Sequence, residues 1–171
     1  MNYLFRKAQS KDADRIWEIL QEAIQKRKEE GSEQWQDGYP NPKVIASDLN
    51  KEQGFVIEVE RQVAAYVSIA VNDEPSYDNI QGSWITQEDF IVFHRAAIGK
   101  NFIGKGLATI LFESIEKYAV ENSIYSIKAD TNFDNGPMLH LFKKLGYVYC
   151  GEVYFRSSSR KAYEKVLHNI Q

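Results

Sequence analysis

The chain has 171 residues, of which 43% are hydrophobic and 26% charged, and its formal net charge is −3. These values are typical of an ordinary soluble globular protein, and we expect one domain over residues 1–171. The slight acidity argues against a nucleic-acid-binding surface, and no apolar run approaches the roughly 20 residues of a membrane span. We therefore expect neither nucleic acid nor a membrane as a partner.

Cysteine and histidine usage narrows the chemistry further. Cys150 is the single cysteine, which excludes an internal disulfide and favours a reducing, cytoplasmic location. The three histidines, His94, His140 and His168, are far apart, and no Cys or His pair has the spacing of metal ligands. The sequence therefore predicts no metal site.

The first forty residues predict a strand, a helix and an aromatic loop. Bulky residues alternate over 3–9, and Ser10 is placed to cap a helix that stops near Gly31. Glycine and prolines then prevent regular structure up to Pro42. Trp35 and Tyr39 in this loop either line a substrate pocket or anchor the loop on the core.

The next segment predicts a second helix and a hairpin. The helix opens at Asn41 or Pro42 and ends at Gly54. Strands follow at 55–60 and 63–71, with Arg61-Gln62 in the turn. Residues 72–89 then form a long acidic loop, either a solvated excursion or a rim that attracts a cationic substrate.

The rest of the chain continues the sheet. Apolar strands at 90–98 and 124–130 flank a helix that starts at Leu107, which predicts a right-handed crossover between parallel strands. Another helix starts at Pro137 and ends at Gly146. Two closing strands are expected at 147–155 and 161–167. The fold class is α/β (α+β), a mixed central sheet of six to seven strands with helices on both faces.

The loop between Ile98 and Leu107 predicts an anion site. A strand, a glycine loop and a helix present backbone N–H groups and a helix N-terminus to an anion, usually a phosphate. A Walker A loop is one interpretation, because Gly99, Gly104 and Lys105 fit it, but Gly106 stands where Ser or Thr should hold Mg²⁺.

Two other phosphate loops compete with this interpretation. A dinucleotide fingerprint would use the close pair Gly104 and Gly106, but Ile110 stands near the place of its third glycine. The third interpretation is a pyrophosphate cradle for coenzyme A. Its backbone amides would come from Ile103, Gly104, Lys105, Gly106, Leu107 and Ala108, with Lys105 adding a point charge.

Two motifs resemble those of the GNAT superfamily of N-acetyltransferases. The stretch from Ile98 to Tyr118 resembles motif A, Q/R-x-x-G-x-G/A, which maps onto Ile103, Gly106 and Ala108. The segment from Asn135 to Tyr147 resembles motif B, and it ends in Leu145-Gly146-Tyr147 where the family commonly has Leu-Gly-Phe. The element order resembles the family over the whole chain.

The resemblance implies a GNAT-like acyl-CoA N-acyltransferase fold with acetyl-CoA as co-substrate. Asn135 is then a further cofactor-binding residue. The strand ending at Ile98 would splay from the strand starting near Ile124, and the pantetheine arm would pair with backbone near Ala96 and Ile98. The amide of Ile98 would donate to the thioester carbonyl.

Two positions depart from the family. Ile103 stands where the family prefers Gln or Arg, so its side chain adds nothing to phosphate binding. Phe142 occupies the position of the tyrosine that many members use to protonate the leaving thiolate. Tyr147, Tyr149 or a water would have to replace it, unless the thiolate leaves unassisted.

A base is also expected, because an alkylammonium must lose a proton before it attacks the thioester. His94 is the leading candidate, since imidazole exchanges protons near neutral pH and strand alternation puts it on the face of Ala96 and Ile98. Glu58, Glu60 and Glu88 are alternatives.

The sequence thus predicts an acyltransferase that moves an acetyl group from acetyl-CoA to a primary amine, in a ternary complex and by direct attack. A small cationic amine suits the acidic loop and the loop of Trp35 and Tyr39. The alternatives are a protein N-terminal or lysine acetyltransferase and a non-catalytic acyl-CoA-binding protein. A homodimer is also possible.

Overall fold

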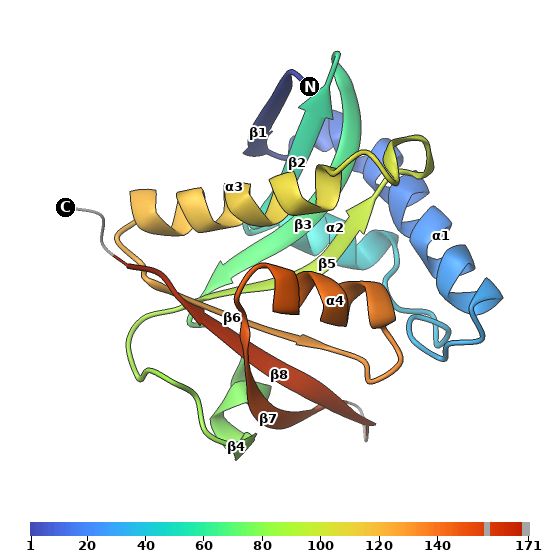
Figure 1. The fold of residues 1–171 in the computed structure, drawn as a ribbon. Coiled ribbons are helices and arrows are strands. Elements are labelled where there is room, and N and C mark those ends of the chain that lie inside the picture. Colours follow the sequence, from blue (N-terminus) through green and yellow to red (C-terminus); the bar gives the residue numbers. More distant parts are fainter. Residues whose placement is uncertain (156–157, 169–171) are drawn as a thin grey trace. The chain divides into compact units, whose positions relative to one another are not determined.

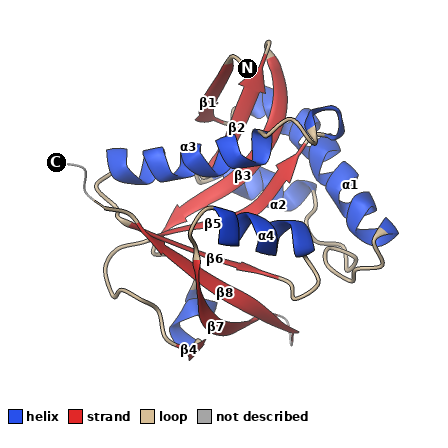
Figure 2. Cartoon of the chain, in the orientation of Figure 1, coloured by secondary structure: helices blue, strands red, loops and turns tan. Residues whose placement is uncertain are grey.

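The computed structural model of the protein describes residues 1–155 and 158–168 (Figure 1). In that part of the chain there are four α-helices: Ala13–Glu29 (α1), Pro42–Asn50 (α2), Leu107–Glu121 (α3) and Gly136–Lys144 (α4). The strands are Tyr3–Lys7 (β1), Gly54–Val59 (β2), Gln62–Val71 (β3), Gln81–Gly82 (β4), Ile91–Ile98 (β5), Ser126–Thr131 (β6), Val148–Phe155 (β7) and Ser158–Val166 (β8) (Figure 2).

The described strands form one mixed sheet of eight, in the order β1-β2-β3-β5-β6-β8-β7-β4. The α+β class is confirmed, but the prediction of six to seven strands was one short. The missing strand is β4, which has only two residues and pairs antiparallel with Gly151 and Glu152. So short a strand leaves no alternating pattern in a sequence.

Contacts between Cα atoms divide the chain into two compact units. Unit 1 comprises Met1–Ile69 and His94–Ser114. Unit 2 comprises Ala70–Phe93 and the described residues from Ile115 onward. The single domain expected over residues 1–171 stays a prediction.

In unit 1, strands β1, β2 and β3 lie side by side and antiparallel (Figure 1). The hairpin turn is at Glu60 and Arg61, one residue earlier than predicted, and both take positive φ, 48° and 65°. Positive φ at both central residues matches the twist of the two strands, so tertiary pairing outweighs the absence of glycine or asparagine. A register shift between Ile57 and Glu58 adds a bulge to β2.

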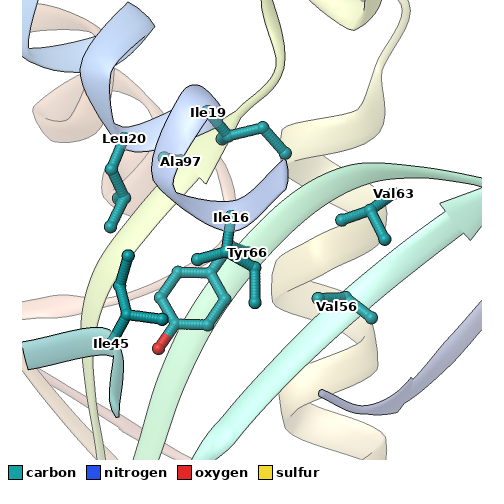
Figure 3. Packing of buried hydrophobic residues seen from close by; sticks show 8 residues of the cluster. All are labelled: Ile16, Ile19, Leu20, Ile45, Val56, Val63, Tyr66 and Ala97. Carbon is teal, nitrogen blue, oxygen red and sulfur yellow. The ribbon is translucent and has the colours of Figure 1, made fainter. Parts of the chain in front are cut away.

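Helix α1 covers these strands with one apolar face. Its fully buried side chains meet α2 and the strands in one cluster, formed by Ile16, Ile19, Leu20, Ile45, Val56, Val63, Tyr66 and Ala97 (Figure 3). Ser10 is not the N-cap that was predicted, because a 3-10 turn at Ser10–Asp12 precedes the helix. Asp12 stabilises this turn by accepting a hydrogen bond of 2.8 Å from the N–H of Gln9.

Helix α2 begins as expected but ends early. The side chain of Asn41 accepts from the N–H of Val44 at 3.1 Å, which is an N-cap, and Pro42 follows in the first turn. The helix ends at Asn50 rather than at Gly54, because Glu52 already has a φ of +55° and Gly54 opens β2.

Unit 2 contains the predicted parallel pair, since Ile91 is in register with Ile127 and Val92 with Lys128. Strands β6, β8 and β7 continue it in antiparallel pairs. Strand β8 begins at Ser158, three residues before the predicted start. Helix α4 ends as predicted, because Gly146 has a φ of +80° and the N–H of Tyr147 returns to the carbonyl of Phe142 at 2.9 Å.

Candidate functional site

The glycine loop leads from β5 into α3 within unit 1. A 3-10 turn at Lys100–Phe102 follows the strand, and its first N–H donates to Glu22 of α1 at 2.6 Å. Gly104 and Gly106 both have left-handed backbone, with φ of +79° and +77°. Residues 103–106 are exposed, and a Cβ on either glycine would meet no atom within 4 Å. The backbone of the loop is therefore open to a ligand.

Helix α3 begins directly after this open backbone. The N–H groups in the first turn of a helix have no partner within the helix and favour an anion. The N–H of Ile110 donates to the carbonyl of Gly106 at 3.2 Å, so the turn is regular from its start. Lys105 is exposed, with its Nζ 5.7 Å from the centre of the Phe102 ring. These features fit the pyrophosphate cradle, whereas the 47%-exposed side chain of Ile103 offers no polar group.

The end of β5 presents its amides in a defined pattern. The N–H of Gly99 donates to the carbonyl of Ala64 on β3 at 2.8 Å. Successive N–H groups of an extended strand point to opposite edges, so the N–H of Ile98 points away from β3. A Cβ at Gly99 would come within 3.2 Å of that Ala64 carbonyl and 2.9 Å of Arg15 Nη2, so a larger residue would have to displace the Arg15 side chain and crowd the carbonyl.

A bulge-like residue interrupts β5 before these amides. Arg95 has a φ of +57°, a left-handed conformation within a strand that otherwise follows the predicted bounds closely. The alternation that put His94 on the face of Ala96 and Ile98 is broken there. That argument for His94 no longer holds, although His94 lies half-buried on the predicted strand and its catalytic role stays a prediction.

The Arg95 side chain ends in a buried polar cluster. Its Nε and Nη2 donate to the two carboxylate oxygens of Asp48 on α2, at 3.0 and 2.6 Å. Asp48 is 3% exposed, and it also accepts from the hydroxyls of Tyr66 and Ser68 on β3. The remaining Arg95 nitrogen, Nη1, donates to the hydroxyl of Tyr39 at 2.5 Å.

Electrostatics fix the protonation of two members of this cluster, Tyr66 and Arg95. Burial, and then the Asp48 carboxylate, raise the pKa of Tyr66 well above its ordinary value, so its hydroxyl remains a neutral donor. Burial alone would lower the pKa of Arg95, but Tyr39 and Asp48 outweigh burial and raise it, so Arg95 stays charged. The cluster is therefore a buried arginine–carboxylate pair to which Tyr66 donates a neutral hydroxyl.

The two aromatic residues of the loop at 31–42 have different surroundings. Trp35 packs, partly buried, against the core cluster of α1 and α2. Tyr39 lies half-buried with its hydroxyl on Arg95 and its ring centre 5.9 Å from Arg95 Cζ. Both residues anchor the loop, and contact with a substrate stays a prediction for each.

The alternative bases lie in different surroundings. Glu58 accepts from Arg6 Nε and Nη2 at 3.0 and 2.9 Å, so an arginine already occupies its carboxylate. Glu60 lies exposed in the hairpin turn, and Glu88 lies exposed in the acidic loop of unit 2.

Unit 2 contains the remaining predicted residues. Asn135 caps α4 by accepting from the N–H of Met138 at 3.3 Å. The ring of Tyr147 lies 5.1 Å from that of the fully buried Phe142, between centroids. Burial, and then Glu116, raise the pKa of Tyr147 well above its ordinary value, which makes its hydroxyl a weaker acid.

Sequence reasoning missed Asp48 and Arg95. A signal for Asp48 was present, because it stands three residues after Ile45 and four after Val44, on the face of α2 that the apolar residues predict to be buried. A charge on such a face needs a partner. Nothing near Arg95 in the sequence indicates that it is this partner.

Comparison with known proteins identifies the fold and the family. The sequence model of the Acetyltransferase (GNAT) family matches residues 13–147. A GNAT-family acetyltransferase from Streptococcus agalactiae 2603 superposes with a TM-score of 0.91 at 32% identity, covering 98% of this chain and 96% of that one. Another from Listeria monocytogenes 4b F2365 has a TM-score of 0.78 at 20% identity, covering 96% and 95%. No curated protein sequence matches the chain.

These matches carry the activity class as well as the fold, because the family model spans most of the chain and one of the solved relatives is about one-third identical over nearly its whole length. Acetyl-CoA is the general co-substrate of the family, and the open glycine loop before α3 is a suitable place for its pyrophosphate. No helix in residues 1–155 or 158–168 is long and apolar enough to cross a membrane. The chain belongs to the GNAT family of acetyltransferases.

Proposed function

We propose that this acetyltransferase transfers the acetyl group of acetyl-CoA to a primary amine of a small cationic molecule, by direct attack in a ternary complex. The observation that carries the proposal is the continuous backbone from Ile98 to Leu107. It joins a strand amide that points away from β3 to an exposed loop with two left-handed glycines and then to a helix N-terminus.

The backbone of the loop would hold the co-substrate. Acetyl-CoA supplies an activated acyl group and an anionic pyrophosphate. The amides of residues 103–108 would bind the pyrophosphate, and the exposed ammonium of Lys105 would add a positive charge that is free to move toward it. Backbone at Ala96 and Ile98 would pair with the pantetheine arm. Cofactor binding by Asn135 of unit 2 stays a prediction of the family resemblance.

The amine must lose a proton, and His94 is proposed to accept it. Support comes from its half-buried position on β5, the strand that also carries Ile98. The amide of Ile98 is proposed to donate to the thioester oxygen, where charge develops during attack. Since burial weakens Tyr147 as an acid, a water is the better donor to the leaving thiolate.

A small acceptor is favoured over a protein because the loop of Trp35 and Tyr39 is fixed to the body of unit 1 by packing and by Arg95. A fixed aromatic loop suits a compact ligand, and aromatic rings attract cations. The net charge of −3 and the exposed carboxylates of Asp73, Asp78, Glu88 and Asp89 favour encounter with a cation.

Isothermal titration with acetyl-CoA and, separately, with Mg²⁺-ATP tests the cradle. We expect micromolar binding of acetyl-CoA and none of ATP, whereas ATP binding without acetyl-CoA binding would restore the Walker A interpretation. Thiol release from acetyl-CoA is then measured with polyamines, arylalkylamines, amino acids and peptides with free N-termini. Turnover with the peptides alone would replace the small amine by a protein acceptor.

A further inference from the structure

Arg95 connects three parts of unit 1 that the proposed reaction needs. Its backbone lies in β5, three residues before Ile98. Its Nε and Nη2 donate to Asp48 on α2, and its Nη1 donates to Tyr39 in the loop at 31–42. The Arg95 side chain is only 11% exposed, so these contacts are shielded from water.

The carboxylate of Asp48 is a fixed anchor for this arginine. Four donor groups point at its two oxygens: Arg95 Nε, Arg95 Nη2, the Tyr66 hydroxyl and the Ser68 hydroxyl. Tyr66 is itself fully buried in the core cluster of α1 and α2 (Figure 3). Because these hydrogen bonds hold the Asp48 carboxylate in place, the carboxylate cannot move with Arg95. The guanidinium of Arg95 is therefore held in one position.

The backbone of Arg95 is in a conformation that arginine disfavours. Its φ of +57° lies in the left-handed region, which non-glycine residues adopt when their surroundings impose it. Ala97 belongs to the same core cluster, so the strand is fixed again two residues later. The bidentate pair with Asp48 and the packing of Ala97 together hold the backbone on both sides of Ala96 in place.

We propose that Arg95 is a positioning residue for acetyl transfer, which fixes through Asp48 the strand carrying the Ala96 and Ile98 amides and through Tyr39 the loop beside the amine. This role rests on the proposed function. The two branches use different guanidinium nitrogens, because the Tyr39 hydroxyl accepts from Nη1, whereas Asp48 accepts from Nε and Nη2.

Three substitutions separate the branches. Arg95→Met removes both and keeps an unbranched side chain of similar length. Arg95→Lys keeps the charge, but a single ammonium cannot reproduce a planar fork that serves two carboxylate oxygens and a phenol. Tyr39→Phe removes the hydroxyl contact of the loop branch and leaves the pair with Asp48 in place. Arg6→Met is the matched control, since Arg6 forms a comparable part-buried pair with Asp12 and Glu58 at 2.8 and 2.9 Å in the same unit.

Amide hydrogen exchange, measured by mass spectrometry on the free proteins, reads the positioning directly. Arg95→Met is expected to speed exchange in peptides covering 94–99 and 35–41 together. Tyr39→Phe is expected to speed it only in 35–41, and Arg6→Met in neither. Equal protection of 94–99 in Arg95→Met and Arg6→Met would overturn the proposal.

Steady-state kinetics with the best amine then tests the catalytic consequence. Misplacement of reacting groups by about 1 Å costs about 100-fold in rate, and we expect a kcat loss of that order for Arg95→Met and Arg95→Lys. Tyr39→Phe should raise the amine KM several-fold and leave kcat and the acetyl-CoA Kd within about twofold. If Arg95→Lys keeps the wild-type kcat, the fork geometry does not matter and the proposal is wrong.

Measurements on the wild-type protein distinguish a failure of this proposal from a failure of the proposed function. Wild-type protein that neither binds acetyl-CoA nor transfers the acetyl group overturns the proposed function, and the catalytic role of Arg95 with it. Wild-type protein that does both, beside Arg95 variants with unchanged kinetics, overturns the role of Arg95 alone. Should Arg95→Met not fold, Arg95→Lys and Tyr39→Phe carry the same comparisons.

Discussion

Lys128 and Glu164 are direct partners in the register of β6 and β8, and both are buried, with exposures of 4% and 0%. Opposite residues of an antiparallel pair share one face of the sheet. Lys128 Nζ lies 4.8 and 4.2 Å from the ring centres of Trp84 and Phe90, which belong to the acidic segment and its exit. The predicted acidic loop at 72–89 is therefore not solvated along its whole length. Trp84, and Phe90 at its exit, attach it to the sheet of unit 2.

Replacing Glu164 should detach this segment. The carboxylate accepts from the N–H groups of Ile85 and Thr86 and from the hydroxyls of Thr86 and Ser126. Glu164→Leu leaves these donors without an acceptor, and we expect a loss of about 3 kcal/mol in the free energy of unfolding by urea.

Glu164→Gln is the control for shape. Its carbonyl oxygen can face the two N–H groups while the two hydroxyls turn to accept from its amide, so the loss should be about 1 kcal/mol. Equal losses for the leucine and glutamine variants would show that the negative charge, rather than the hydrogen bonds, holds the segment.

Lys128→Met should stabilise the protein at neutral pH. Burial lowers the pKa of Lys128, and Glu164, Cys150 and Asp78 oppose that shift without cancelling it. The charged lysine therefore costs stability wherever it is protonated in the folded state. Methionine keeps the packing against the aromatic rings, and we expect the free energy of unfolding to rise by about 1 kcal/mol.

The lowered pKa of Lys128 also predicts how the free energy of unfolding changes with pH. Between the lowered pKa of Lys128 and its ordinary value of 10.5, the unfolded chain binds a proton that the folded chain does not, so wild-type stability gains from this group as pH rises. The gain is absent in Lys128→Met. Urea unfolding at pH 7 and at pH 10 checks it, and a constant difference between the two proteins would contradict the lowered pKa.

Most of the sheet could be predicted because its signals are local. Apolar runs predicted the bounds of β5 and β6 to within a residue or two, and Gly146 predicted where α4 ends. The conformation of Arg95 could not be predicted from its neighbours in the sequence, and its ion-pair partner Asp48 lies 47 residues earlier in the chain. Strand alternation assumes a regular backbone, and a tertiary ion pair can override it at one residue.

For the candidate site, only the local part of the prediction can be compared with the structure. The glycine loop is a local pattern, and it leads into α3, which begins at Leu107 as predicted. Whether Trp35 and Tyr39 line a pocket or anchor the loop depends on contacts that no local pattern records. In the structure Trp35 packs against the core cluster, and the hydroxyl of Tyr39 accepts a hydrogen bond from the Arg95 guanidinium.

Gly106→Ala should weaken acetyl-CoA binding about tenfold or more, because a Cβ would stand where backbone must approach the pyrophosphate. The left-handed φ of +77° also costs stability, about 1 kcal/mol for alanine. Gly31→Ala is the matched control, since Gly31 has a φ of +76° and equal space around it but lies after α1. Isothermal titration should show a changed Kd for Gly106→Ala alone.

Tyr147→Phe should leave kcat within about threefold of the wild type. Its buried hydroxyl has a raised pKa and is a poor proton donor to a thiolate. A general acid contributes about 10²-fold or more, so a loss of that size would restore Tyr147 as the group that takes over from the missing tyrosine at Phe142.

His94→Gln should lower kcat/KM about 100-fold at pH 7, because the attacking amine then arrives protonated and finds no base. The deficit should shrink as pH rises toward the amine pKa near ~10.4, since more of the amine then arrives neutral. His140→Gln, an exposed histidine on α4, should change nothing. Measuring kcat/KM for the three proteins from pH 7 to 9.5 decides the matter: a deficit in His94→Gln that does not vary with pH would assign His94 a structural role in β5 instead.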